Sequence, residues 1–216
     1  MRKLIVATIG FEEKFMIRAI TRHGLDRGDQ ILLLTGPSTE KSMNTVNLIR
    51  GFITKYYDKD VVVHVKEVPV NDFLASVLAI KQSINERSKE SVDVIVNLSG
   101  GMRILVIATL LALATLNLRN VLIEIETEDY SSIVNIPAEI LLLGRPKLSR
   151  RLLDILRILI ESQEPLSVNE IAEKLQRDAS TIRRHLIKLR KMKLVEAKKP
   201  KPLILQPSPL ARLLLM

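Results

Sequence analysis

Residues 92–103 read VDVIVNLSGGMR. A mostly apolar run is followed here by two adjacent glycines, Gly100 and Gly101. The run Val92–Val96 is short and rich in β-branched residues, which is typical of a buried strand. The apolar stretch Met102–Asn117 that follows is long enough for a helix. The segment therefore predicts a strand and a helix that are joined by the turn Asn97–Gly101.

The same alternation of apolar strands and helices continues on both sides of this segment. Strands are predicted at residues 4–9, 31–34 and 61–65, and a hairpin of strands at 121–125 and 132–136 follows. Each helix between the first strands is predicted to place one group of apolar residues inward. The groups are Phe11, Phe15 and Ala19 in the first helix, Met43, Val46, Ile49 and Ile53 in the second, and Phe73, Val77, Ile80 and Ile84 in the third. This alternation predicts an α/β fold, a Rossmann-like doubly wound parallel sheet.

A ligand site is expected where the winding of such a sheet reverses. In the common strand order 3-2-1-4-5, this point lies beyond the carboxyl ends of strands 1 and 4. The turn after strand 1 is Ile9–Glu12, and the turn after strand 4 is Asn97–Arg103. The unusual Gly-Gly turn is therefore expected at the binding crevice.

The residues of the fourth turn suit a phosphate group. Glycine lets the backbone turn sharply and approach a ligand closely, and the free N–H groups of the next helix favour an anion. Arg103 adds a guanidinium fork of the kind that binds phosphate. The alternative is a purely structural strand–helix turn with Arg103 exposed to water.

Several other kinds of site are excluded by the sequence. There is no G-x-G-x-x-G and no G-K-[ST] sequence, which disfavours redox dinucleotides and nucleotide triphosphate hydrolysis. The absence of cysteine excludes disulfides, thiol nucleophiles, zinc fingers and iron–sulfur clusters. The three histidines have no metal-ligand spacing, so we expect no metal, no cofactor and no catalytic residue.

Charge divides the chain into two predicted domains, residues 1–143 and 144–216. The chain has a net charge of +9, and residues 147–216 carry all of the excess. A concentrated basic block favours a nucleic-acid partner, although a solvated basic surface is the alternative. The longest uncharged run, Ile104–Leu118, is shorter than a membrane span, so we expect a soluble, cytoplasmic protein with no membrane partner.

The basic part has the pattern of a winged helix-turn-helix. Leu152, Ile155, Leu156 and Leu159 mark a first amphipathic helix. Ser167 and Glu170 form a capping box before a second helix, with Leu166 and Ile171 placed as its hydrophobic staple. After a short turn, Asp178 can cap a third, basic helix with Ile182, Leu186 and Leu189 inward.

Residues early in the third helix are expected to face the major groove of DNA. These are Ser180, Thr181, Arg183, Arg184 and Lys188. A wing between strands at 194–197 and 203–205 carries Lys198, Lys199 and Lys201. Because residues 147–216 contain no aromatic residue for stacking single-stranded bases, double-stranded DNA is the expected partner. A structural three-helix module is the alternative, and His185 is expected to be a hydrogen-bonded packing residue.

The turns Thr8–Glu12 and Ser99–Arg103, followed by a winged helix, resemble those of a known family. It comprises CRISPR-associated transcription regulators of archaea that join a CARF domain (CRISPR-associated Rossmann fold) to a C-terminal winged helix, the Csa-three type. The resemblance covers nearly the whole chain. Asn97 stands where related motifs often carry an acid.

The resemblance implies a homodimer that binds a cyclic oligoadenylate, with cyclic tetra-adenylate as the expected ring, across its two-fold axis. The implied ligand contacts are Ile9, Gly10, Phe11, Ser99, Gly100, Gly101, Met102 and Arg103, with Thr35, Gly36, Pro37 and Ser38 completing the pocket. One alternative is a ring nuclease that cleaves the same ligand with help from Ser99 and Arg103. Against it, the two turns contain no histidine and no adjacent carboxylate-plus-base pair apart from Glu12, which has an ordinary role at a helix N-terminus available. Another alternative is a regulator that senses a different nucleotide.

Overall fold

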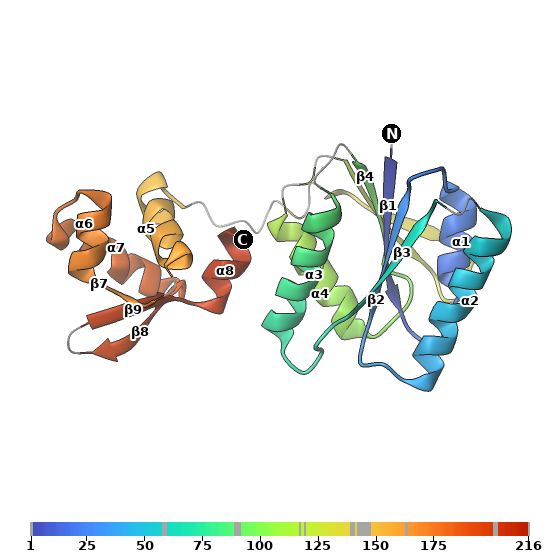
Figure 1. Cartoon of the computed structure of the whole chain (residues 1–216), viewed down its shortest axis with the longest axis horizontal. Helices are drawn as coiled ribbons and strands as arrows, with labels where there is room; N and C mark the ends of the chain where they lie inside the picture. The colour runs from blue at the N-terminus through green and yellow to red at the C-terminus, as the bar shows by residue number, and fades with distance from the viewer. Residues whose placement is uncertain are drawn as a thin grey trace. The chain divides into compact units, whose positions relative to one another are not determined.

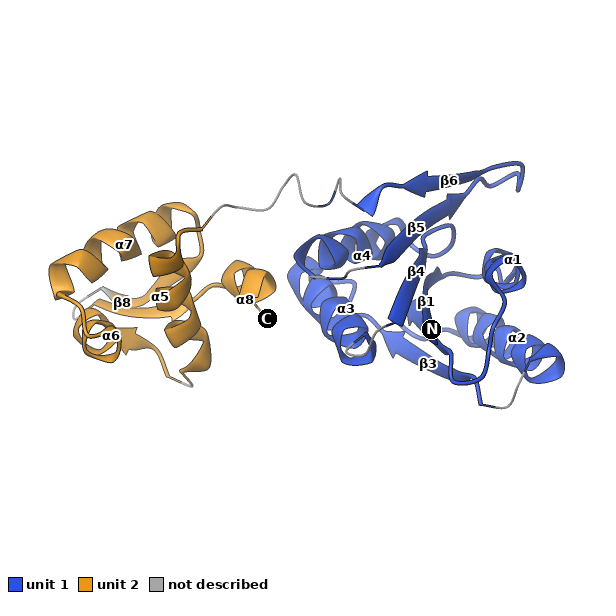
Figure 2. Cartoon of the chain, turned by 90° about the horizontal axis from the view of Figure 1, so that it is seen from above, with its two compact units in different colours: residues 1–145 blue, residues 146–216 orange. Residues whose placement is uncertain are grey.

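The chain divides into two compact units, residues 1–145 and 146–216, shown in Figure 2. The computed structural model describes residues 2–57, 60–88, 92–116, 118, 120–138, 141, 148–162, 164–200 and 203–215. The predicted domain boundary between residues 143 and 144 lies outside the described residues. No described helix combines the length and the apolar composition that a bilayer crossing requires.

The first unit is built on a six-stranded sheet. Its strands are β1 (Arg2–Ile9), β2 (Gln30–Thr35), β3 (Val62–Glu67), β4 (Val92–Asn97), β5 (Val121–Glu126) and β6 (Ile133–Ile136). Their order is β3-β2-β1-β4-β5-β6, with the first five parallel and β6 antiparallel to β5. The predicted Rossmann-like class, the strand order and the terminal hairpin are confirmed.

Helices cover both faces of this sheet, as Figure 1 shows, with α1 and α2 on one face and α3 and α4 on the other. They span α1 (Lys14–His23), α2 (Glu40–Tyr56), α3 (Phe73–Arg87) and α4 (Arg103–Thr115). The central strand β1 is buried from Leu4 to Ile9 because both of its faces are covered. Gly24 ends α1 with a φ of 64°, and Asp72 caps α3.

Three residues that were predicted to lie inward are exposed instead. Phe11 precedes α1, whose N-cap is Glu13, so Phe11 lies in the turn after β1 with 69% of its surface exposed. Met43 and Phe73 lie in the first turns of α2 and α3, and both are partly exposed there. The predicted C-terminal residue of α4, Asn117, is outside the described residues.

The second unit contains three helices, a three-stranded sheet and a closing helix. The helices are α5 (Arg150–Glu161), α6 (Val168–Leu175), α7 (Ala179–Lys191) and α8 (Pro209–Leu215). The strands are β7 (Leu166–Ser167), β8 (Val195–Pro200) and β9 (Leu203–Pro207), in the order β7-β9-β8. Apolar residues from all three helices, including Ile155, Ile171 and Leu186, form one core.

Local signals of the second unit are confirmed at atomic level. Ser167 and Glu170 form the reciprocal capping box of α6, and Asp178 caps α7. Gln176 ends α6 in the left-handed conformation, with a φ of 51°. The short strand β7, which pairs with β9, was not predicted because two residues carry no periodic pattern.

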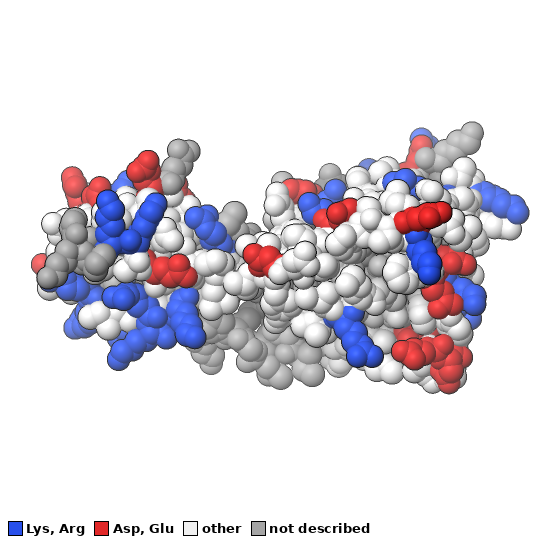
Figure 3. All heavy atoms as spheres, turned by 90° about the horizontal axis from the view of Figure 1, so that it is seen from below, with Lys and Arg blue, Asp and Glu red and all other residues white. Residues whose placement is uncertain are grey.

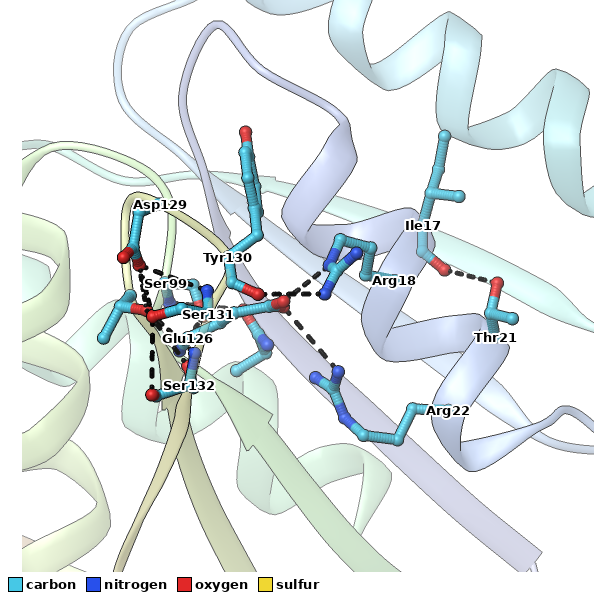
Figure 4. Close-up of polar contacts among 12 residues, drawn as sticks. Ile17, Arg18, Thr21, Arg22, Ser99, Glu126, Asp129, Tyr130, Ser131 and Ser132 are labelled. Carbon is cyan, nitrogen blue, oxygen red and sulfur yellow. Dashed lines mark hydrogen bonds and ion pairs between the residues drawn. The ribbon is translucent and has the colours of Figure 1, made fainter.

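A buried charge network joins α1 to β5 in the first unit. Glu124 and Glu126 are almost fully buried, and their i, i+2 spacing places them on one face of β5. Arg22 contacts Glu124 at 2.9 Å and Glu126 at 3.7 Å, while Arg18 contacts Glu126 at 2.5 Å. His23 lies 2.9 Å from Glu124. Figure 4 shows Arg18 and Arg22 reaching from α1 toward Glu126.

The same network holds the turn after β4. The Asn97 side chain donates to Glu124 at 2.9 Å and accepts from the Ser99 N–H at 3.2 Å. The Glu126 N–H in turn donates to the Ser99 hydroxyl oxygen at 2.8 Å. Asn97 therefore has a structural role, and the carboxylate beside this turn comes from Glu124 on the neighbouring strand.

The protonation of Glu124 is linked to the stability of this arrangement. Burial raises the pKa of Glu124, but hydrogen bonds from Arg22, Asn97 and His23 outweigh it and hold the pKa below its usual value of 4.5. Because the folded-state pKa is lowered, the unfolded chain binds more protons at acidic pH. The stabilisation is complete above pH 4.5 and is lost as the pH falls through the folded pKa.

We predict that Glu124→Gln lowers the free energy of unfolding at pH 7 by about 2–3 kcal/mol, because it removes the nearer of the two carboxylates that Arg22 contacts. The variant should also lose less stability than wild type between pH 6 and pH 3. Urea unfolding followed by tyrosine fluorescence checks this, since all three tyrosines lie in the first unit. Glu128→Gln, an exposed change in the same hairpin, is the control. Equal stability losses for the two variants would contradict the prediction.

Candidate functional site

The turns after β1 and β4 pack directly against each other. A Cβ atom on Gly10 would lie 3.2 Å from both the Cα and the N of Gly101. Gly101 has a φ of +85°, and a Cβ there would lie 3.1 Å from the carbonyl carbon of Thr8. The Thr8 hydroxyl donates to the Gly100 carbonyl at 2.5 Å. Side chains are therefore excluded from this contact, and the two turns present a surface of bare backbone.

The N-terminus of α4 lies at this backbone surface. Its N-cap, Met102, makes no side-chain capping bond, and the first turn contains no acidic residue. Arg103 is exposed, and its side chain has no hydrogen bond or ion pair with any described residue. Free helix N–H groups and an unpaired guanidinium together make this place suitable for an anion.

The predicted contacts after β2 are only partly available to a ligand. A Cβ on Gly36 would lie 2.8 Å from the sulfur of Met102, so this turn adjoins the other two. Pro37 is exposed, while both the N–H and the hydroxyl of Ser38 donate to Glu67. Ile9 and Thr35 are each only 4% exposed. Little of either residue is therefore accessible to a ligand.

Glu12 is already paired within the first unit. It accepts a 2.5 Å hydrogen bond from the Tyr130 hydroxyl and lies 3.2 Å from the Lys14 ammonium. The bond from Tyr130 lowers the pKa of Glu12 and raises the pKa of Tyr130 to about 12. The predicted role at the helix N-terminus is wrong, because Glu13 is the N-cap of α1. Glu12 stays ionised, which makes it a weak general base.

Helix α7 presents a basic outer face. Asp178 accepts from the N–H groups of Ser180 and Thr181 at 3.0 and 3.2 Å, and also from the Ser180 hydroxyl. Arg183, Arg184 and Lys188 are exposed and form no ion pair with a described residue. Lysine and arginine side chains gather over the second unit in Figure 3, whereas they are mixed with acidic ones over the first.

The wing differs in one respect from the prediction. Lys198 and Lys199 are exposed, but they belong to strand β8 rather than to the loop. The pairing of β8 with β9 shifts register between Ala197 and Lys199, so Lys198 lies at a β-bulge. Lys201 is outside the described residues.

His185 was predicted to be hydrogen-bonded, and this is wrong. Both ring nitrogens are buried, and neither has a hydrogen-bond partner among the described residues. Burial lowers the pKa of His185, and the charges of Arg184, Lys188 and Arg151 lower it further. The imidazole is therefore neutral at pH 7. No local sequence pattern signals this, because α5 and α7 meet only in the folded unit.

Comparison with protein families agrees with both parts of this description. Residues 3–137 match the Csa3 CRISPR-associated Rossmann-like domain, and residues 151–201 match an HTH domain. No curated protein matches the chain. The first match covers more than half of the chain, and the HTH match coincides with the basic α7 face. The resemblance drawn from the two turns is confirmed: the chain is a DNA-binding, CRISPR-associated regulator that belongs to the family with the Csa3 CRISPR-associated Rossmann-like domain.

Proposed function

We propose that the chain is a ligand-responsive transcription regulator that senses cyclic oligoadenylate and binds double-stranded DNA. The main support for ligand sensing is the contact of Gly10 with Gly101, at the point where the winding of the sheet reverses. This contact leaves backbone, an uncapped helix N-terminus and Arg103 side by side. Backbone N–H groups and a guanidinium are the donors that suit a phosphodiester.

The surface beside this site supports a homodimer. Ile107 and Leu111 on α4 are 53% and 41% exposed, and Met102 at the start of the same helix is also exposed. A second copy that covers this apolar face would bring two Arg103 loops together about a two-fold axis. A cyclic tetranucleotide can share that symmetry, so each loop would meet an equivalent pair of phosphates.

Binding is better supported than cleavage of the ligand. The Ser99 hydroxyl already accepts from the Glu126 N–H, and Glu12 is held ionised by Tyr130 and Lys14. Neither residue is arranged as the base that would activate a ribose hydroxyl. The signal passes instead to the DNA-binding unit: the ligand favours one dimer arrangement, and this changes the spacing of the two α7 helices.

Ligand binding is tested by isothermal titration of cyclic tetra-adenylate into wild type and Arg103→Ala. We predict an affinity loss of about tenfold or more for the variant, because a charge-assisted hydrogen bond to phosphate is removed. Arg50→Ala, an equal change of charge on the exposed face of α2, should bind like wild type. Equal affinities for wild type and Arg103→Ala would remove Arg103 from the site.

DNA binding is tested with Arg183→Ala and Lys199→Ala on a randomised duplex library. Arg183→Ala should weaken binding and relax the preference at one base position, at a cost of about 1–3 kcal/mol. Lys199→Ala should weaken all sequences alike and flatten the log–log salt slope by about 0.9 for each lost phosphate contact. An unchanged base preference in the first variant, or an unchanged slope in the second, would argue against the assigned contact.

A further inference from the structure

A cavity of about 360 Å³ opens in the second unit between α5, the α6–α7 turn and α7. Its apolar lining includes Ile155 and Ile182, and its polar lining includes Arg151, Arg177, Arg184 and His185. The volume falls in the range of small-molecule sites, which combine an apolar floor with a few convergent polar groups. The cavity lies wholly within the second unit, so it is separate from the glycine turns of the first.

The guanidinium groups of these three arginines are unpaired among the described residues. None of these side chains makes a hydrogen bond or an ion pair with a residue that the structure describes. Of the two lining carboxylates, Asp178 is occupied in capping α7, and Asp154 lies 3.9 Å from Arg157. The three arginines are exposed, and together they outnumber the two lining carboxylates, so the cavity favours an anion.

His185 also lines the cavity. Its two ring nitrogens are closed to solvent and have no described hydrogen-bond partner. A buried polar group without a partner costs about 1–3 kcal/mol, and here one donor and one acceptor are both left unpaired. Packing alone would be served better by an apolar side chain.

We propose that this cavity binds a phosphate group that is attached to a small, partly apolar body such as a sugar. The arginine forks would hold the phosphate oxygens, and the apolar lining would contact the carbon face. A rotation of the His185 ring would be needed to bring one of its nitrogens to the ligand. Phosphate of this kind comes either from a free phosphomonoester or from the DNA backbone.

Occupation of the cavity is coupled to DNA recognition whichever source supplies the phosphate. Thr181 and Arg184 line the cavity and also belong to the helix that is expected to face the major groove. A free phosphomonoester would therefore compete with DNA, whereas a backbone phosphate would anchor it. The inference deepens the DNA-binding proposal in the second case only, and it stands alone in the first.

The test follows the His185 ring of the full chain by NMR, with His185→Gln used to assign its signals. The charged groups around this ring are Arg151 and Asp154 from α5, Arg177 and Asp178 from the turn, and Arg184 and Lys188 from α7. An added anion should offset the cations and raise the pKa of His185 by about one unit. The probes are inorganic phosphate and ribose 5-phosphate, against sodium chloride at equal ionic strength.

Two variants separate the sources. Arg151 lines the cavity and its exposed neighbour Arg150 does not, so Arg151→Ala and Arg150→Ala change the same charge at adjacent positions. A pKa rise with ribose 5-phosphate in wild type and Arg150→Ala, but not in Arg151→Ala, would identify a free phosphomonoester. If only duplex DNA raises the pKa, and Arg151→Ala loses at least threefold more DNA affinity than Arg150→Ala, the backbone is the source.

The proposal is overturned if neither phosphate probe nor DNA moves the His185 pKa beyond the chloride control. Failure of DNA binding alone is a separate outcome, because the phosphate probes report on the cavity without DNA. The wild-type measurement needs no substitution in the cavity, so misfolding of a variant cannot produce the negative result.

Discussion

Two backbone segments approach so closely in the first unit that no side chain fits between them. Gly10 and Gly101 are within van der Waals contact through their main chains, and Gly101 adopts a positive φ that other residues rarely tolerate. This contact can form only where β1 and β4 are neighbours and both end at the same edge of the sheet. The bare backbone surface, the placement of the N-terminus of α4 and the position of Arg103 all depend on this contact.

A network of buried charged residues next to this contact holds the fourth turn in place. Asn97 and Ser99 connect the fourth turn to Glu124 and Glu126, and these carboxylates are neutralised by Arg18 and Arg22 from α1. Such pairs add little net stability, but removing one member leaves the other buried without a partner. The network thus fixes one geometry for the turn, as a preorganised anion site requires.

Much of this was accessible from the sequence, because it depends on local signals. Apolar runs predicted β1, β2 and β4, and the capping box located α6. The inward placement of Phe11 was wrong, since spacing alone cannot show where α1 begins. Other features depend on segments that are far apart in the sequence, so local patterns could not predict them. They are the pairs of Arg18 and Arg22 with β5, the Tyr130 bond to Glu12, and the lack of a described partner for His185. One sequence pattern hinted at the network. Glu124 and Glu126 alternate with apolar residues in a strand, and Arg18 and Arg22 are spaced i, i+4 in the first helix.

The central claim is that the two adjoining glycine turns form the ligand surface. Hydrogen–deuterium exchange of the wild-type chain, with and without cyclic tetra-adenylate, addresses it directly. The account predicts slower exchange in the peptides that cover residues 9–12 and 99–106, including the first amides of α4. Slower exchange elsewhere, with both of these segments unchanged at saturating ligand, would contradict it.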